Sequence, residues 1–283
     1  MNNLLAFDVD GTLSDVYSNI QPGIKPVFLD NRILKSNIIF ATGNTITTIK
    51  TMRQNLLKLN PKLNKSFTYS ACLGGSIIYD KQDNIVFQKF LCRKKLVMYL
   101  DKCIKIDPGC FFMFMLEDRQ VFAHTTNEIK SYIISKFGKM NMDENEISFN
   151  DEEYHTLLKK LPRIYSVNIF SYNHYLDFYN ELSPEVKAAK YFAYIDYRWN
   201  MVQIASGNKL NAVKYMAKKL KEENLFNKNA KDMVYFGDGE NDIPCLKMCN
   251  FSIARGSDLP QKVVDAATVY TEDVTPYLNQ IFK

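Results

Sequence analysis

The sequence predicts an α/β protein whose core is a doubly wound parallel sheet, split by an inserted α+β domain. Three observations predict this fold: short apolar runs that end in Gly-containing turns, alternating strand-like and helix-like segments towards both ends, and a middle stretch of different texture. A length of 283 residues is enough for about two domains. We therefore expect a core domain of residues 1–79 plus 205–283 and an inserted domain of residues 80–204.

Two short apolar runs, residues 4–9 and 37–41, predict the first strands of the core, because buried parallel strands are apolar on both faces. Apolar side chains then recur at helical spacing through residues 46–59, which predicts a helix. Residues 42–45 precede it and are typical of an amino-terminal cap. Strand, turn and helix in this order make a βα unit.

The carboxyl-terminal part repeats this alternation. We expect helices at residues 210–220 and 243–248 and strands at 233–236 and 251–254. Alternating strands and helices argue for a parallel sheet.

The middle of the chain mixes its elements differently. A hairpin of residues 111–116 and 121–123 is expected to turn at residues 117–120. Two further strands, at 166–170 and 191–195, and three helices, at 94–104, 127–137 and 183–189, complete this prediction. Such a mixture is typical of an α+β insertion that leaves the core and returns to it.

Composition and charge exclude several classes of protein. Hydrophobic residues make up 46% of the chain and charged residues 24%, which argues against intrinsic disorder. Lys and Arg (36) exceed Asp and Glu (31) by only five, and this excess is spread along the chain. Short basic runs at residues 93–95 and 218–221 are typical of solvated helix faces. We therefore expect no nucleic-acid partner.

Several features predict a cytoplasmic protein without a membrane partner. A monomer and a homodimer are both compatible with the sequence, which leaves the oligomeric state open. Residues 1–9 lack the features of a secretory signal, and the most apolar run, 110–116, is shorter than the roughly 18 residues that cross a bilayer. The six cysteines form no C-x-x-C pair and share no zinc-like spacing with the three histidines. Such cysteines are typical of reduced thiols.

Two acids, Asp8 and Asp10, follow the first strand. Alternation along a strand would point both carboxylates the same way at its carboxyl end, the edge where open α/β sheets bind ligands. A chance buried pair of aspartates would only repel. The pair therefore predicts a functional site.

Four segments in order resemble the motifs of the haloacid dehalogenase superfamily of phosphohydrolases. They are Asp8-Val9-Asp10-Gly11-Thr12-Leu13, Thr42, Lys209 and Gly237-Asp238-Gly239-Glu240-Asn241-Asp242. The resemblance implies a doubly wound, Rossmann-like core with a large cap inserted between the second and third motifs. Leu73-Gly74-Gly75-Ser76-Ile77-Ile78-Tyr79 is similar to the segment that leads into the cap of the Cof-type branch, which carries a type IIB cap.

The resemblance also implies catalytic roles. Asp8 would attack phosphorus and form an aspartyl phosphate, and Asp10 would protonate the leaving oxygen and then deprotonate the hydrolytic water. Mg²⁺ would be held by Asp8, the backbone carbonyl of Asp10 and Asp238, with Asp242 joining directly or through water.

Four residues are expected to bind the phosphoryl group. The hydroxyl of Thr42 and the backbone N–H of Gly43 lie where a helix begins, which suits an anion site or a simple cap equally, and the resemblance together with the position after the second strand favours the anion site. By resemblance, Lys209 would neutralise the phosphoryl group and Asp8, Asp242 would help to hold Lys209, and Asn241 would orient ligand or water.

Three positions depart from the family pattern. Asn44 stands where many relatives carry arginine, Gly74-Gly75-Ser76 where Asn-Gly-Ala is usual, and Arg255-Gly256-Ser257 where Met-Gly-Asn is frequent. Whether they alter substrate specificity is open at this point.

The resemblance implies a Mg²⁺-dependent phosphatase for a small phosphorylated metabolite, such as a sugar phosphate or a phosphorylated cofactor, with specificity set by the cap. The alternatives are a phosphomutase of the same superfamily and a non-catalytic sensor of a phosphorylated ligand. A capped nucleic-acid-binding module would need a clustered basic face, which the sequence does not show.

Overall fold

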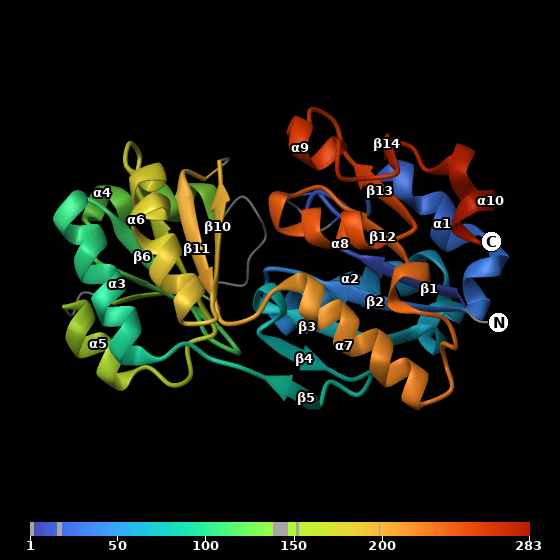
Figure 1. The fold of residues 1–283 in the computed structure, drawn as a ribbon, viewed down its shortest axis with the longest axis horizontal. Coiled ribbons are helices and arrows are strands. Elements are labelled where there is room, and N and C mark those ends of the chain that lie inside the picture. Colours follow the sequence, from blue (N-terminus) through green and yellow to red (C-terminus); the bar gives the residue numbers. More distant parts are fainter. Residues whose placement is uncertain (1–2, 16–18, 138–146, 151–152, 198) are drawn as a thin grey trace. The chain divides into compact units, whose positions relative to one another are not determined.

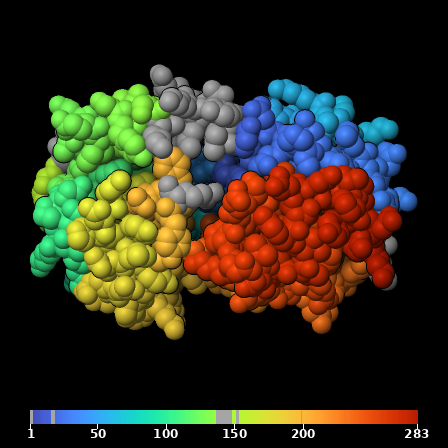
Figure 2. Space-filling model, turned by 90° about the horizontal axis from the view of Figure 1, so that it is seen from above, coloured from blue at the N-terminus to red at the C-terminus, as the bar shows by residue number. Residues whose placement is uncertain are grey.

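The computed structural model describes residues 3–15, 19–137, 147–150, 153–197 and 199–283. The chain forms two compact units (Figure 1): a discontinuous core unit, Met1–Phe87 with Lys209–Lys283, and a continuous inserted unit, Gln88–Asn208. Figure 2 shows the first and last parts of the chain, in blue and red, packed together in the core unit. The expected boundaries, after residues 79 and 204, lie a few residues earlier: residues 85–88 add a strand to the core sheet, and residues 206–208 still belong to the inserted unit before the helix at Lys209 begins.

The core sheet is parallel around its central strand. Among the described residues it has eight strands, in the order β14-β13-β12-β1-β2-β3-β4-β5. The strand β1 (Asn3–Phe7) pairs in parallel with β2 (Ser36–Ala41) and with β12 (Val234–Gly237). Three more strands run parallel to their neighbours: β3 (Phe67–Cys72), β13 (Phe251–Arg255) and β14 (Val269–Thr271). The strand β4 (Ile77–Tyr79) is antiparallel to β3, and β5 (Ile85–Gln88) lies at the edge of the sheet.

The order of the strands reverses at β1. Chain order runs from β1 to β2 and β3 on one side, and from β12 to β13 and β14 on the other. In open α/β sheets, ligands bind outside the carboxyl ends of the strands at this reversal. The topology therefore predicts a site where β1 and β12 end.

Helices cover both faces of the core sheet. The strand β1 is buried on both sides: Leu4 and Ala6 belong to one apolar cluster, and Phe7 packs against Phe28 and stacks on Phe236, with ring centroids 4.4 Å apart. The helices of the core unit are α1 (Lys25–Leu29), α2 (Ile46–Leu59), α7 (Lys209–Glu222), α8 (Ile243–Met248), α9 (Gln261–Val264) and α10 (Leu278–Ile281). The predicted doubly wound core is confirmed.

The inserted unit is an α+β layer. Its sheet has the order β10-β11-β9-β6-β7-β8, antiparallel except between β7 and β8. Its strands are β6 (Phe111–Met115), β7 (Gln120–Ala123), β8 (Ile147–Asn150), β9 (Ser166–Phe170), β10 (Phe192–Asp196) and β11 (Met201–Ala205). Its helices are α3 (Arg93–Ile106), α4 (Asn127–Phe137), α5 (Tyr154–Lys160) and α6 (Tyr175–Ala188).

One predicted helix begins in the wrong place. The expected helix of residues 183–189 is the end of α6, which begins at Tyr175 and contains Pro184 in its interior. Its buried side chains, Phe178, Leu182 and Val186, keep helical spacing through the proline. Packing of this apolar face therefore outweighs the backbone hydrogen bond that Pro184 removes.

Two further predictions can be compared with the structure. No helix among the described residues is long and apolar enough to span a bilayer. All six cysteines are free thiols.

Candidate active site

The first predicted acid, Asp8, directly follows β1 at the carboxyl edge of the core sheet. The backbone N–H of Asp8 donates to the carbonyl of Phe236, 2.9 Å away, so the β1–β12 ladder extends one residue beyond the strand. The chain then turns, because the carbonyl of Val9 accepts the N–H groups of Leu13 and Ser14. Asp8 is 6% exposed, whereas Asp10 lies in this turn and is exposed.

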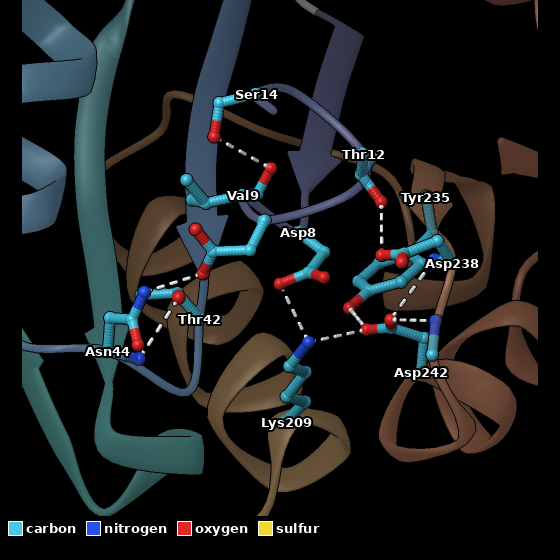
Figure 3. A network of polar contacts seen from close by, with 12 residues as sticks. Asp8, Val9, Thr12, Ser14, Thr42, Asn44, Lys209, Tyr235, Asp238 and Asp242 are labelled. Carbon is cyan, nitrogen blue, oxygen red and sulfur yellow. Dashed lines mark hydrogen bonds and ion pairs between the residues drawn. The ribbon is translucent and has the colours of Figure 1, made fainter. Parts of the chain in front are cut away.

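Gly11 is required by the shape of the turn. Its φ is +83°, a conformation that favours glycine, and a Cβ atom placed there would lie 2.1 Å from Oδ2 of Asp238. The next residue, Thr12, donates its hydroxyl proton to Oδ1 of Asp238, 2.9 Å away (Figure 3). The turn after β1 and the acid after β12 therefore pack directly against each other.

Lys209 joins two of the acids (Figure 3). It is the first residue of α7 and its side chain is 2% exposed. Its Nζ lies 2.7 Å from Oδ1 of Asp8 and 2.8 Å from Oδ1 of Asp242. A buried lysine is rare unless its charge is paired, and here two carboxylates pair with it.

Asp242 is surrounded by donors. Its Oδ1 accepts from Lys209 and from the hydroxyl of Tyr235, 2.6 Å away, and its Oδ2 accepts from the backbone N–H groups of Asp238 and Gly239, at 3.3 and 3.0 Å. A carboxylate has about four acceptor positions, and four protein donors approach this one, the longest bond being that from the N–H of Asp238. Asp242 therefore fixes the position of Lys209 and of the backbone of the fourth motif.

Burial and the neighbouring charges together determine the pKa values of Asp8 and Lys209. Burial raises the pKa of Asp8 well above its ordinary value, and Asp242 and Asp238 raise it further while Lys209 lowers it. Burial alone would lower the pKa of Lys209, but the two carboxylates more than reverse this, so its pKa is raised. The lysine is therefore a permanent cation, and the acids still carry more negative charge than it compensates.

Asp10 has a different partner. The side-chain amide of Asn44 donates to Oδ2 of Asp10, 2.6 Å away. Asn44 is one of the departures from the family pattern, and its sequence context gave no role for it. In the structure it orients the second acid of the motif from the loop after β2.

The loop after β2 holds Thr42 and Gly43 in position. Thr42 is buried, and its Oγ1 accepts from the N–H of Asn44, 3.1 Å away. The cap of α2 is Thr45, whose own hydroxyl makes no capping bond. The segment that departs from Asn-Gly-Ala supports this loop by its backbone: the N–H of Leu73 donates to Asn44 and that of Gly74 to Thr42.

Arg255 supports the turn after β1. The residue is 3% exposed, and its Nη1 donates to the carbonyl of Thr12 at 3.0 Å, to the carbonyl of Gly11 at 3.3 Å and to Oε1 of Gln21 at 2.5 Å. The side chain of Gln21 also donates to the carbonyls of Gly11 and Ser14. A second departure from the family pattern thus fixes the loop that carries Asp10.

Asn241 lies within the fourth motif, next to Asp242. Its Oδ1 is 2.9 Å from the position that a Cβ atom at Gly239 would occupy.

The structure brings Asp8, Lys209, Asp238 and Asp242 together, with Asp10, Thr42 and Gly43 on the adjoining loops. Sequence reasoning did not select Thr12, Gln21 or Tyr235, because a threonine, a glutamine or a strand tyrosine has no distinctive signal alone.

The sequence was compared with known protein families and structures. A model of the haloacid dehalogenase-like hydrolases matches residues 5–275. The chain belongs to this family.

Solved structures share the fold of this haloacid dehalogenase-like hydrolase. The HAD subclass IIB sugar phosphatase BT4131 has a TM-score of 0.71 and 16% identity, over 95% of this chain and 93% of that one. A haloacid dehalogenase-like hydrolase from Bacteroides thetaiotaomicron gives 0.72 and 15%, over 99% and 100%. Another from B. subtilis gives 0.72 and 14%, over 95% and 94%. A search of the curated proteins found no match.

The donor set of this family member suits a hard divalent cation. Asp8, Asp238 and Asp242 each offer a carboxylate oxygen within 4.8 Å of the others, and all three are buried. Carboxylate oxygens are the ligands that Mg²⁺ prefers. A cation here would supply the positive charge that Lys209 alone does not provide, so the residues fit the ion.

Proposed function

We propose that this haloacid dehalogenase-like hydrolase is a Mg²⁺-dependent phosphatase that hydrolyses a small phosphorylated metabolite through an aspartyl phosphate on Asp8. One observation carries the proposal: Asp8 is buried at the carboxyl edge of the sheet, 2.7 Å from the cation of Lys209 and beside two further acids. Family membership supports it, as does a fold shared with a sugar phosphatase.

In the first step a carboxylate oxygen of Asp8 attacks phosphorus while the bond from phosphorus to the leaving oxygen breaks. Lys209 occupies Oδ1 of Asp8, which leaves Oδ2 for the attack. Asp10 gives its proton to the leaving oxygen. Because Asn44 donates to Oδ2 of Asp10, the proton would sit on Oδ1.

In the second step Asp10 takes a proton from water, the water oxygen bonds to phosphorus, and the bond between phosphorus and Asp8 breaks. The free carboxylate of Asp8 and inorganic phosphate result. Asp10 thus ends each cycle protonated again. Its exposure suits exchange of protons with water.

We assign the phosphoryl oxygens to the hydroxyl of Thr42, the N–H of Gly43 and the ammonium of Lys209, with Asn241 orienting ligand or water. The Thr42 hydroxyl accepts from Asn44, so its own proton remains for the ligand. A Cβ atom at Gly43 would meet no described atom within 4 Å, which leaves room beside its N–H.

We assign Mg²⁺ to Asp8, the carbonyl of Asp10 and Asp238. The ion would reduce the repulsion between the carboxylates and the phosphoryl oxygens. Four protein donors leave Asp242 no oxygen free for a direct bond to the ion, so we assign it contact through a water that shares Oδ2, where the bond from the N–H of Asp238 is long at 3.3 Å. We further propose a cytoplasmic location, supported by the six free thiols.

Phosphate release from a panel of sugar phosphates, nucleotides, pyridoxal phosphate and flavin mononucleotide tests this function. We expect release with Mg²⁺, none with EDTA, and a loss of at least about 1,000-fold for Asp8→Asn, because an amide cannot form the phosphoenzyme. The matched control is Asp118→Asn, the same change at a side chain that is 66% exposed. Product analysis separates hydrolysis from transfer within one sugar. Turnover by a folded Asp8→Asn variant would contradict the mechanism.

A further inference from the structure

A polar cavity lies in the core unit near the start of β3. Its volume is about 370 Å³, and Arg53, Asn64, Lys65, Phe67, Lys81 and Gln82 line it. Phe67 is the first residue of β3, whereas the last, Cys72, leads into the segment that supports Thr42. The cavity is therefore separate from the candidate active site.

Arg53 forms a fixed wall of this cavity. It reaches from α2 with Nη1 on Oδ1 of Asp83 and Nη2 on the hydroxyl of Ser70, both at 2.7 Å. Its Nε is buried and has no hydrogen-bond partner. Since the side chain of Arg53 is only 12% exposed and makes these two bonds, its position is fixed before a ligand binds.

Two lysines at the cavity carry uncompensated charge. Lys65 ends a short 3-10 helix before β3, and Lys81 lies in the turn between β4 and β5. Neither makes an ion pair with any residue that the structure describes, and the side-chain amides of Asn64 and Gln82 make no hydrogen bond there either. These four groups are available to a ligand.

The nearby acids do not cancel this charge. Asp83 pairs with Arg53 and lies 3.6 Å from Lys50, and Asp80 accepts backbone N–H groups of its own turn. Four cations (Lys50, Arg53, Lys65 and Lys81) thus face two carboxylates, which leaves a positive surplus at the cavity. The ring of Phe67 adds an apolar surface.

We infer that this cavity is a binding site for a small phosphorylated molecule with at least two negative charges. Lys65 and Lys81 would pair with the phosphate oxygens, the amides of Asn64 and Gln82 would bond to hydroxyl or phosphate oxygens, and Phe67 would cover the carbon skeleton. The volume lies at the small end of the usual range for ligand pockets, about 300–1,000 Å³, which suits a small ligand.

Isothermal titration with pyrophosphate and with fructose 1,6-bisphosphate tests this site. The protein carries Asp8→Asn and is kept in EDTA, so that no ligand is consumed. Two chains are compared: one with Lys65→Gln and Lys81→Gln, and one with Lys58→Gln and Lys62→Gln. The second pair removes the same charge from exposed positions nearby that do not line the cavity. Circular dichroism confirms that both chains fold.

We expect the cavity variant to bind at least about tenfold more weakly, and the control less than about twofold more weakly, than the parent. The uncharged sugar fructose should not bind. Equal losses in both double variants would indicate a general charge effect and overturn the inference, as would unchanged binding in the cavity variant or no binding by the parent. The result does not depend on turnover, so it stands apart from the proposed function.

Discussion

Asp8 and Asp10 are two residues apart but have different surroundings. Asp8 is buried with Lys209, whereas Asp10 is exposed and bonded to a neutral amide. A nucleophile needs a fixed geometry, and a proton donor needs access to water. The two environments match the two proposed roles, since burial with a cation fixes one acid and exposure leaves the other free to exchange protons.

Asn44→Ala removes the donor that orients Asp10. We expect kcat to fall about tenfold with little change in KM, because the lost hydrogen bond acts on the proton donor and not on the bound phosphate. Steady-state kinetics with the best substrate of the panel measures this. Asn31→Ala, at an exposed position, is the control. A kcat equal to that of the control would remove Asn44 from the mechanism.

Asp238→Asn tests the cation site by stability instead of turnover. Mg²⁺ that binds only the folded chain stabilises it by about 2.7 kcal/mol at 100 times its dissociation constant. We expect Mg²⁺ to raise the Tm of the parent chain and to leave that of Asp238→Asn nearly unchanged. The amide oxygen can still accept from Thr12, so the variant should fold. A full Mg²⁺ shift in the variant would exclude Asp238 as a ligand.

At the scale of the elements, the turn after β1 and the loop after β2 use glycine differently. Gly11→Ala should lower the Tm by several degrees and weaken Mg²⁺ binding, because its φ is positive and its Cβ would clash with Asp238. Gly43→Ala should leave the Tm within about one degree, since its Cβ meets no described atom. Thermal unfolding of both variants measures the contrast. Equal shifts would contradict it.

Periodic elements were predictable, and those governed by tertiary contacts were not. The helices α2, α4 and α8 and the strand β9 have the predicted bounds, because their apolar spacing is regular. No strand was expected at β3, since Thr68 and Ser70 interrupt its apolar residues. In the structure both are buried: the hydroxyl of Thr68 donates to Ile38, and that of Ser70 accepts from Arg53.

The candidate site shows the same division. We predicted Asp8, Lys209, Asp238 and Asp242 from the sequence, because acids and a lysine at the spacing of the family motifs indicate a functional site more strongly than a structural role. Tyr235 and Arg255 were not selected, because their roles depend on how the chain folds: Tyr235 bonds to Asp242 across the turn after β12, and Arg255 bonds to carbonyls more than 240 residues away. For Arg255, the sequence signal was an arginine at the end of a predicted strand.

At the scale of the whole molecule, the inserted unit is continuous and its two ends meet. The hydroxyl of Ser206 donates to the carbonyl of Lys89, 2.6 Å away, and the unit has its own apolar core from α3, α5, α6 and the sheet. We expect a chain of residues 88–208 to fold alone, with cooperative unfolding in urea. Residues 1–87 alone should not, because they lack β12 and α7. A non-cooperative transition for 88–208 would refute this.

The place of β1 between β2 and β12 also bears on synthesis of the protein. Leu5 pairs with Val234, 229 positions later, so one edge of the central strand has no partner until the ribosome has passed β12. At about 5–20 residues per second this takes on the order of 10 to 50 s. The inserted unit is complete well before then. We expect the nascent core to depend on chaperones during that interval, because an unpaired apolar strand edge is a template for aggregation.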